Sequence, residues 1–171
     1  MNTINIYDLA IIGGGPAGAA AGVYAGRKKM KTVLITESFG GQSFVSESIE
    51  NWIGTRKISG LEFAKMLEDH VRTYDNVEIK MPEKVATIRE IKGGFEIATD
   101  KGTYRSKTLI VVSGGRRRQL NVPGEDKFNG RGVSYCSTCD APLFKDKEVA
   151  VVGGGNAGLE AAVDLLPYAS K

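Results

Sequence analysis

Histidine, cysteine and long apolar runs are scarce in this sequence, and each scarcity excludes a class of protein. The 171 residues contain one histidine and two cysteines. A structural zinc site takes four ligands, mostly from these two residue types, so we expect no zinc site within one chain. No apolar run approaches the roughly 20 residues that cross a membrane. The apolar start at Ile4 and Ile6 has no basic leader or cleavage site, so no signal peptide is expected.

Excess charge of either sign is also missing. The sequence has 23 Lys and Arg against 20 Asp and Glu, a net charge of +3. This balance favours neither nucleic acid nor a membrane surface as the main partner. The dense basic run Arg116–Arg118 is too short for a nucleic-acid arm, and we interpret it as a solvated loop. Two cysteines without a secretion signal predict a reducing compartment, the cytoplasm, where such a pair is more often catalytic or metal-binding than structural.

Glycine, by contrast, is abundant and clustered. An apolar segment at residues 7–12 leads directly into Gly-x-Gly-x-x-Gly at Gly13, Gly15 and Gly18, and an alanine-rich helix is expected over residues 17–27. In such a motif the first glycine allows the tight turn, the second lets a pyrophosphate approach the backbone, and the third lets the helix pack on the strand. The free N–H groups and the helix dipole then face the anion.

The residues that follow support a nucleotide site. The strand expected at residues 32–36 ends at Glu37, 24 residues beyond Gly13. An acidic residue there binds ribose hydroxyls and repels a 2′-phosphate, so the site favours FAD or NAD. A glycine-rich turn without a ligand does not account for a strand, three glycines, a helix, a second strand and an acid in this order. The adjacent Gly40 and Gly41 fit either a close approach to a flat ring or a plain turn.

The middle of the chain completes one α/β domain. Ser59 and Glu62 form the capping box of a predicted helix, whose apolar stripe we assign to the core: Phe63, Met66, Leu67, Val71 and Tyr74. After a short strand at 77–80, the pattern predicts a three-stranded antiparallel meander over residues 85–91, 95–99 and 103–105. A separate parallel strand is expected at 108–112, ending in Ser113-Gly114-Gly115.

The nucleotide-loop pattern then begins a second time. Residues 116–131 are polar and rich in turn signals, and we interpret them as a linker. A strand is expected at 148–152, followed by a second Gly-x-Gly-x-x-Gly at Gly153, Gly155 and Gly158 and by a helix over 159–166. Two such units in one chain predict two nucleotides.

The two cysteines lie between the linker and the second loop, in Cys136-Ser137-Thr138-Cys139-Asp140. A zinc half-site, two idle thiols and a redox disulfide are the alternatives. The redox disulfide fits best, because a bond across two residues gains little loop-closure entropy and is easier to reduce than a structural one. Asp140 is placed to carry a proton to or from a thiolate.

Together these motifs resemble the low-molecular-weight thioredoxin reductase family, which includes the flavoprotein subunit of alkyl hydroperoxide reductase. The most specific match is Cys-x-x-Cys-Asp just before a second Gly-x-Gly-x-x-Gly. The matching segments run through almost the whole chain: residues 13–18, 40–42, 50–52, 122–125, 132–140 and 149–156. Residues 139–144 and 159–164 lean toward the peroxide-reductase branch.

The resemblance implies an α/β fold with a Rossmann-like FAD-binding domain, built from a parallel sheet with helices and an antiparallel meander, over residues 1–115. Residues 116–131 would be a linker or hinge, and residues 132–171 the start of a Rossmann-like NADPH-binding domain. It also implies a relay in which NADPH reduces FAD, the flavin reduces a Cys136–Cys139 disulfide, and the dithiol reduces a small partner protein, thioredoxin-like or peroxiredoxin-type. Members of the family are usually homodimers.

By the same resemblance Cys136, Cys139 and the acid Asp140 are catalytic. The expected FAD contacts are Gly13, Gly15, Pro16, Ala17, Gly18, Glu37, Gly41, Gln42, Asn51, Val85 and Gly114. The expected NADPH contacts are Gly153, Gly155, Asn156 and Gly158. The sequence departs from the family at Ser113-Gly114-Gly115, where Ala-Thr-Gly is usual, and family members are longer. Two alternatives therefore stay open: a truncated, non-catalytic flavin-binding module, and a family member that uses a donor other than NADPH.

Overall fold

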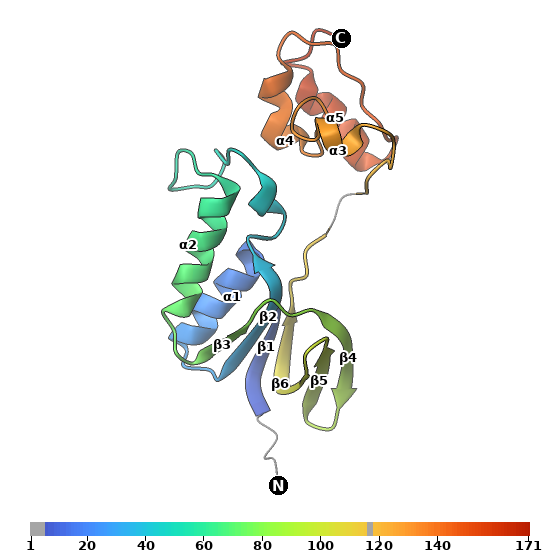
Figure 1. Cartoon of the computed structure of the whole chain (residues 1–171). Helices are drawn as coiled ribbons and strands as arrows, with labels where there is room; N and C mark the ends of the chain where they lie inside the picture. The colour runs from blue at the N-terminus through green and yellow to red at the C-terminus, as the bar shows by residue number, and fades with distance from the viewer. Residues whose placement is uncertain (1–5, 116–117) are drawn as a thin grey trace. The chain divides into compact units, whose positions relative to one another are not determined.

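A computed structural model describes residues 6–115 and 118–171, so Ile4, Arg116 and Arg117 lie outside the described residues. The chain divides into two compact units, Met1–Gly115 and Arg116–Lys171, and each is described by itself (Figure 1). Among the described residues, no helix combines the length and apolarity needed to cross a membrane.

The first unit is built on one mixed sheet of six strands in the order β3-β2-β1-β6-β5-β4. Its first four strands in this order run parallel, and β6, β5 and β4 run antiparallel. The strands are β1 (Ile6–Gly14), β2 (Thr32–Phe39), β3 (Val77–Lys80), β4 (Val85–Ile91), β5 (Gly94–Thr99) and β6 (Thr103–Val111). The predicted parallel sheet with an antiparallel meander is therefore confirmed.

One strand serves both halves of the sheet, which corrects the sequence prediction. The expected strands at 103–105 and 108–112 are a single strand, β6. One edge of β6 pairs antiparallel with β5, as in Ile97 opposite Tyr104. The other edge pairs parallel with β1, as in Leu9 opposite Thr108. A strand has two hydrogen-bonding edges, so one strand can close the meander with its first residues and extend the parallel sheet with the residues that follow, the two pairings overlapping at Arg105 and Ser106.

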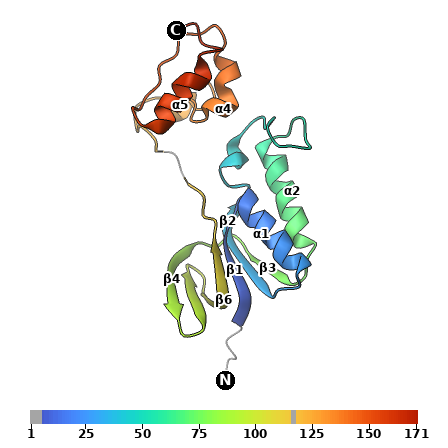
Figure 2. The ribbon, with the colours of Figure 1, turned by 180° about the vertical axis from the view of Figure 1, so that it is seen from behind.

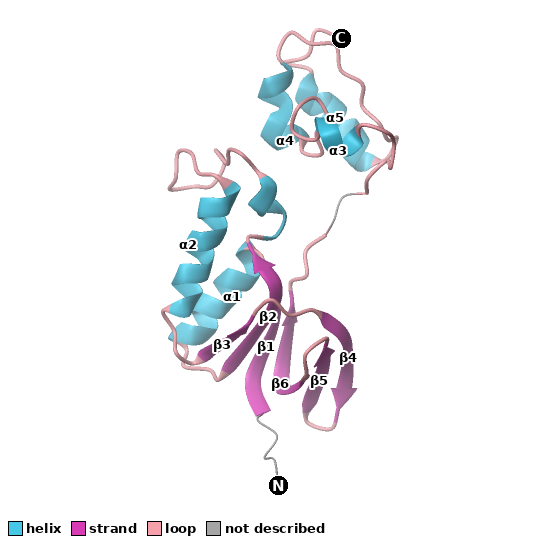
Figure 3. Ribbon diagram, viewed as in Figure 1, coloured by secondary structure: helices cyan, strands magenta, loops and turns pink. Residues whose placement is uncertain are grey.

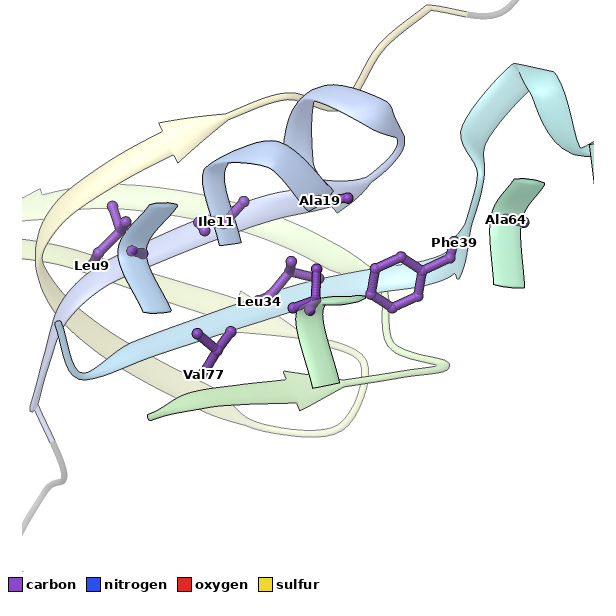
Figure 4. Packing of buried hydrophobic residues seen from close by; sticks show 9 residues of the cluster. Leu9, Ile11, Ala19, Leu34, Phe39, Ala64 and Val77 are labelled. Carbon is purple, nitrogen blue, oxygen red and sulfur yellow. The ribbon is translucent and has the colours of Figure 1, made fainter. Parts of the chain in front are cut away.

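Two helices, α1 (Pro16–Arg27) and α2 (Gly60–Arg72), cover one face of the sheet (Figures 1 and 2). Small residues let α1 lie close: a Cβ at Gly22 would be only 3.2 Å from Val71 and 3.3 Å from Leu34. Figure 4 shows the core between these layers. It consists of Leu9, Ile11, Ala19, Ala25, Leu34, Phe39, Ala64, Val71 and Val77.

The capping box at the start of α2 is confirmed: the Ser59 side chain accepts from the Glu62 backbone N–H, and the Glu62 side chain accepts from that of Ser59. The predicted stripe is correct at Phe63 and Val71, which are buried. It is wrong at Met66, whose exposed fraction is 40%. Successive helical residues point about 100° apart, so Met66 lies at the edge of the stripe and faces solvent.

The opposite face of the sheet carries a second apolar cluster of Tyr7, Ala10, Ile12, Val33, Ile35 and Ile97. Ile97 belongs to β5, so the antiparallel strands cover this face of the parallel strands. Burial on both faces explains why β1 and β2 read as continuous apolar runs rather than as alternating strands.

The second unit is helical where the sequence predicted otherwise (Figure 3). It contains α3 (Glu125–Phe128), α4 (Ser137–Asp140), a 3₁₀ turn at Ala141–Phe144 and α5 (Asn156–Leu165). Helix α3 lies within residues 116–131, the segment that the sequence predicts to be a linker. Buried Glu125 orders this segment by accepting hydrogen bonds from the Leu120 and Val122 backbone N–H groups and from the Tyr135 hydroxyl.

The strand predicted at 148–152 does not form. Among residues 118–171 no strand is present. Two backbone hydrogen bonds nevertheless lie beside this segment: the Val149 N–H donates to the Lys171 carbonyl oxygen at 2.8 Å, and the Ser170 N–H donates to that of Lys147 at 2.9 Å. An apolar run becomes a strand only where a neighbouring strand takes up its N–H and C=O groups. Val152 consequently stays 66% exposed.

Candidate functional site

Two glycines of the first loop are required by the fold itself. Gly13 has φ +113°, and a Cβ there would lie 2.4 Å from the Val112 carbonyl oxygen on the strand-end segment after β6. A Cβ at Gly18 would lie 1.8 Å from the Gly13 carbonyl oxygen. Both positions exclude any side chain, so the turn between β1 and α1 closes only with glycine.

Gly15 is different, because no described residue other than its chain neighbours crowds the space beside it. The nearest heavy atom to a Cβ built there is the Gly41 Cα at 3.9 Å, an ordinary contact. Gly15 is the N-cap of α1, with Pro16 in its first turn and Ala17 next. The fold would tolerate a side chain at Gly15, so the bare backbone there leaves room for something outside the chain. It lies at the N-terminus of a helix, the kind of place where unpaired N–H groups attract anions in proteins.

The ends of β2 and β6 meet at the same edge of the sheet. Gly40 and Gly41 have φ +89° and +57° and begin the 3₁₀ turn η1 (Gly41–Val45) after β2. A Cβ at Gly41 would lie 3.3 Å from the Gly15 Cα. The Gln42 side-chain amide donates to the Gly115 carbonyl oxygen beyond β6, next to Gly114. Parallel sheets bind ligands at this carboxyl edge.

Three other predicted FAD contacts of the first unit, described next, are Glu37, Asn51 and Val85. Glu37 is exposed within β2, which runs on to Phe39 instead of ending at Thr36. Asn51 is exposed in the loop that the Ile49–Ile58 bridge closes. Val85 begins β4 half-buried and packs against the second apolar cluster. The hydrogen bond and close approaches that join Gly15, Gly41, Gln42 and Gly115 do not include these three residues.

The second loop repeats the backbone geometry of the first. Gly153 has φ +123° against +113° at Gly13. The N-cap glycines match as well, with φ and ψ of −86° and 178° at Gly155 and −70° and −178° at Gly15. A Cβ at Gly158 would lie 2.0 Å from the Gly153 carbonyl oxygen. Helix α5 starts at Asn156, three residues before the predicted start.

What surrounds the second loop differs. No described heavy atom lies within 4 Å of a Cβ built at Gly153, because no strand stands where β6 flanks Gly13. Val149 and Val151 border an open hollow of about 300 Å³ together with Leu165 and Leu166 of the α5 region. The glycine turn of the second unit is thus formed, whereas no sheet forms beneath it within residues 118–171.

The two cysteines are joined. The Cys136 and Cys139 sulfurs are 2.17 Å apart, with Cα atoms 5.2 Å apart, so of the three alternatives the structure contains the disulfide. Cys136 is the N-cap of the short helix α4, half-buried, and Cys139 is exposed. The described residues hold no group of three or more His, Cys, Asp or Glu side chains able to bind a metal ion. A disulfide with one exposed cysteine is open to thiol–disulfide exchange.

Side chains around the disulfide hold its turn in place. The Ser134 hydroxyl donates to Asp140 Oδ2 at 2.5 Å and accepts from the Cys136 backbone N–H at 3.1 Å. Asp140 is therefore fixed in the same turn as both cysteines. On the other side, the Ser137 hydroxyl donates to Asp164 Oδ2 at 2.8 Å. The residues between the two cysteines are thus anchored to α5.

Sequence reasoning missed Ser134, Asp164 and Glu125. Ser134 stands two residues before Cys136, and a short polar side chain so placed is a known signal for a local backbone hydrogen bond. Asp164 is 27 residues from Ser137, and no spacing rule connects them. Glu125 is acidic at the start of a four-residue helix, where the N-terminal dipole favours a negative charge.

A family model described as pyridine nucleotide-disulphide oxidoreductase matches residues 7–171 of the chain. Curated relatives include an alkyl hydroperoxide reductase subunit of Pseudomonas putida, 46% identical over 167 residues. Another is an NADH dehydrogenase of Bacillus subtilis (strain 168), 45% identical over 160 residues. These alignments cover 96% and 93% of this chain but 32% and 31% of the relatives. The chain thus spans about a third of their length.

Solved structures with a similar fold include two thioredoxin reductases. The thioredoxin reductase from Streptococcus pyogenes MGAS5005 is 38% identical with a TM-score of 0.88, over 97% of this chain and 54% of that one. A thioredoxin reductase from Giardia duodenalis is 32% identical with a TM-score of 0.90, over 98% and 54%. The family model covers more than half of the chain, so the chain belongs to the pyridine nucleotide-disulphide oxidoreductase family.

Proposed function

We propose that this chain carries the electron-accepting half of a thioredoxin-reductase-like protein-disulfide reductase. In the proposed reaction, electrons pass from NADPH through FAD to the Cys136–Cys139 disulfide and then to a disulfide on a small partner protein. The observation that carries the proposal is the disulfide itself. It lies in a turn with one exposed cysteine and a carboxylate fixed by Ser134, in the same unit as the second glycine loop.

FAD fits the first unit. The pyrophosphate would lie against Gly15 and the N-terminus of α1, where the chain leaves space that its own packing does not require. Gly41, Gln42 and Gly114 would border the flavin, and the remaining holders would be Gly13, Pro16, Ala17, Gly18, Glu37, Asn51 and Val85. When bound, FAD supplies two-electron chemistry between a nicotinamide and a disulfide.

The second unit would hold the pyrophosphate of NADPH at Gly153, Gly155, Asn156 and Gly158. Asp140 would exchange a proton with the cysteine thiol, since its carboxylate is held in the same turn by Ser134. Reduction breaks the S–S bond and adds two electrons and two protons. A carboxyl group at this turn would deliver one of these protons to a thiolate.

The partner we propose is a small protein with an accessible disulfide, thioredoxin-like or peroxiredoxin-type. Both kinds are consistent with the names of the relatives, an alkyl hydroperoxide reductase subunit and thioredoxin reductases. We further propose a homodimer in the cytoplasm, a hinge within residues 116–131, and the division into an FAD-binding part at 1–115 and an NADPH-binding part at 132–171.

The test is a visible absorption spectrum of the purified chain, with FAD quantified per chain after denaturation. About one FAD per chain is the expected result. Anaerobic addition of a reductant that reduces the bound flavin should then release two thiols in the wild type and none in a C136S/C139S variant. A chain that takes up FAD but releases no thiols contradicts the relay, and a chain that takes up no added FAD contradicts flavin binding by these residues.

Two alternatives have support of their own. The unformed strand at 148–152 and the open hollow at Val149 and Val151 favour a chain that binds flavin without pyridine-nucleotide activity. The relative named NADH dehydrogenase makes a donor other than NADPH the second candidate. Anaerobic flavin bleaching separates them, because NADPH, NADH and dithionite-reduced flavin would be tested in parallel on the same FAD-loaded chain.

A further inference from the structure

The residues between the two cysteines are tied to a carboxylate on another helix. Ser137 Oγ donates to Asp164 Oδ2 at 2.8 Å, and Thr138 Oγ1 donates to the same oxygen at 3.2 Å. Asp164 lies in the last turn of α5, the helix that begins at the second glycine loop, and is half-buried. Figures 1 and 2 both show α4 and α5 side by side in the second unit. One acidic side chain thus accepts hydrogen bonds from both hydroxyls of the Cys-Ser-Thr-Cys turn.

The geometry points to Asp164 as a positioning residue that sets the reduction potential of the Cys136–Cys139 disulfide. The inference rests on the proposed use of this disulfide as the redox centre. Asp164 acts in two ways, through the Ser137 and Thr138 hydroxyls that it holds and through its negative charge beside the cysteine turn. Both effects bear on the reduced state, because a disulfide is neutral and a cysteine thiolate is not.

The sign follows from the charge. A nearby carboxylate disfavours a thiolate, so it destabilises the reduced pair relative to the disulfide. The two hydroxyls are natural donors to a thiolate, and a carboxylate that engages them withholds those hydrogen bonds. Removing Asp164 should therefore favour the dithiol and make the cysteine pair more oxidising. Removing the hydroxyls while Asp164 stays should do the opposite, because the carboxylate then faces the turn without its two donors.

The experiment is a thiol–disulfide equilibrium in glutathione redox buffers, with reduced and oxidised chain separated after acid quenching and thiol alkylation. Two glutathione molecules reduce the disulfide and leave as oxidised glutathione, so the balance needs neither FAD nor NADPH. The result is therefore independent of the proposed electron relay. A chain that fails to bind FAD still reports on Asp164, and a null result for Asp164 leaves flavin binding intact.

Three variants decide the inference. D164A should shift the equilibrium constant roughly threefold to tenfold toward the dithiol, the range expected for a charge near a partly exposed turn. D164N keeps an acceptor and loses the charge, so its shift should have the same sign and be smaller. S137A/T138V should shift about twofold or more toward the disulfide. A purely structural role would loosen the turn in all three and move them in the same direction.

The matched control is E160Q. Glu160 is exposed on the same helix, one turn before Asp164, and its loss should change the equilibrium less than about twofold. Alkylation rates of the reduced chain against pH give a second readout, in which D164A should lower the pKa of the reactive thiol. The inference is overturned if D164A stays within twofold of the wild type, or if D164A and S137A/T138V shift the same way. Where circular dichroism shows that D164A is unfolded, D164N and S137A/T138V decide by their opposite signs.

Discussion

Alanine substitutions at Gly18 and Gly15 separate a glycine that the fold needs from one that a ligand needs. A Cβ at Gly18 would lie 1.8 Å from the Gly13 carbonyl oxygen, so α1 or the turn must move by more than about 1 Å to reach even a tight contact. Overpacking of this kind costs about 1–3 kcal/mol, and backbone is the group that must move. We expect G18A to lower the free energy of unfolding by about 3 kcal/mol.

Gly15 gives the opposite expectation. Its φ is −70°, and a Cβ there would be 3.9 Å from the nearest heavy atom of the chain. Alanine is a poorer N-cap than glycine, so G15A should change the free energy of unfolding by less than about 1 kcal/mol. Its methyl group would occupy the space proposed for the FAD pyrophosphate. Loss of one charge-assisted hydrogen bond there weakens FAD binding by about tenfold or more.

The assay has a built-in probe. Trp52 is the only tryptophan of the chain, lies in the first unit, and contacts the Phe63 ring edge-on at 4.8 Å between centroids. Its fluorescence in a urea titration reports unfolding of the first unit alone. FAD uptake is measured by flavin absorbance after gel filtration. G102A is the control, because a Cβ at Gly102 would be 4.0 Å from its nearest neighbour, in a turn between β5 and β6.

Two results would refute the reasoning. If G15A loses as much stability as G18A, the open space beside Gly15 is not a property of the folded chain. If G15A binds FAD as tightly as the wild type and G102A, Gly15 is not the glycine that the pyrophosphate approaches. A stable G15A that has lost FAD, beside an unstable G18A, is the expected pair.

Four further substitutions test the packing and electrostatics. Phe63→Ala removes a side chain that is 1% exposed and should cost about 3–5 kcal/mol in the same titration. Ser59→Ala removes the N-cap of α2 and should cost about 1 kcal/mol. The pKa of Glu78 is lowered from 4.5 by hydrogen bonds from Lys80 and then Tyr7. The stabilisation of the fold by the Glu78 carboxylate is therefore present above pH 4.5 and is lost as the pH falls through the lowered pKa. Glu78→Gln should consequently flatten the acid dependence of the urea midpoint. Gly158→Ala places a Cβ 2.0 Å from the Gly153 oxygen and should lower the helix signal of α5 in circular dichroism.

The features that sequence predicted well are those with local causes. The turn at Gly13 is specified by residues within a few positions of it, as are the start of α1, at Pro16 where residue 17 was predicted, and the capping box at Ser59. Each uses hydrogen bonds or steric limits between residues at most five apart. The Cys-x-x-Cys disulfide belongs to the same class, since its two cysteines are three positions apart.

The features that sequence mispredicted depend on partners far along the chain. β6 looked like two strands because residues 103–105 alternate and residues 108–111 are continuously apolar. The change reflects a change of neighbour, from β5 on one edge to β1 on the other. Met66 satisfied the helical period and yet faces solvent, because burial depends on which arc of α2 the sheet and α1 cover. Asp164 could not be connected with Ser137 by any periodic pattern across 27 residues.

The two glycine loops have the same motif but different surroundings, so comparing them separates local from distant causes of structure within one molecule. Their backbone angles at the first glycine and at the helix N-cap agree to within about 16°, so a Gly-x-Gly-x-x-Gly turn and its helix N-terminus form from their own residues. Gly13 is also enclosed by Val112 and Ser113 just beyond β6, whereas no described heavy atom outside the chain neighbours of Gly153 lies within 4 Å of a Cβ built there. The glycine turn of the predicted nucleotide site is therefore encoded in about six residues. Its strand, and the walls that would select one nucleotide over another, require neighbouring strands. A Gly-x-Gly-x-x-Gly motif accordingly predicts the geometry of its own turn well and the strands around it poorly.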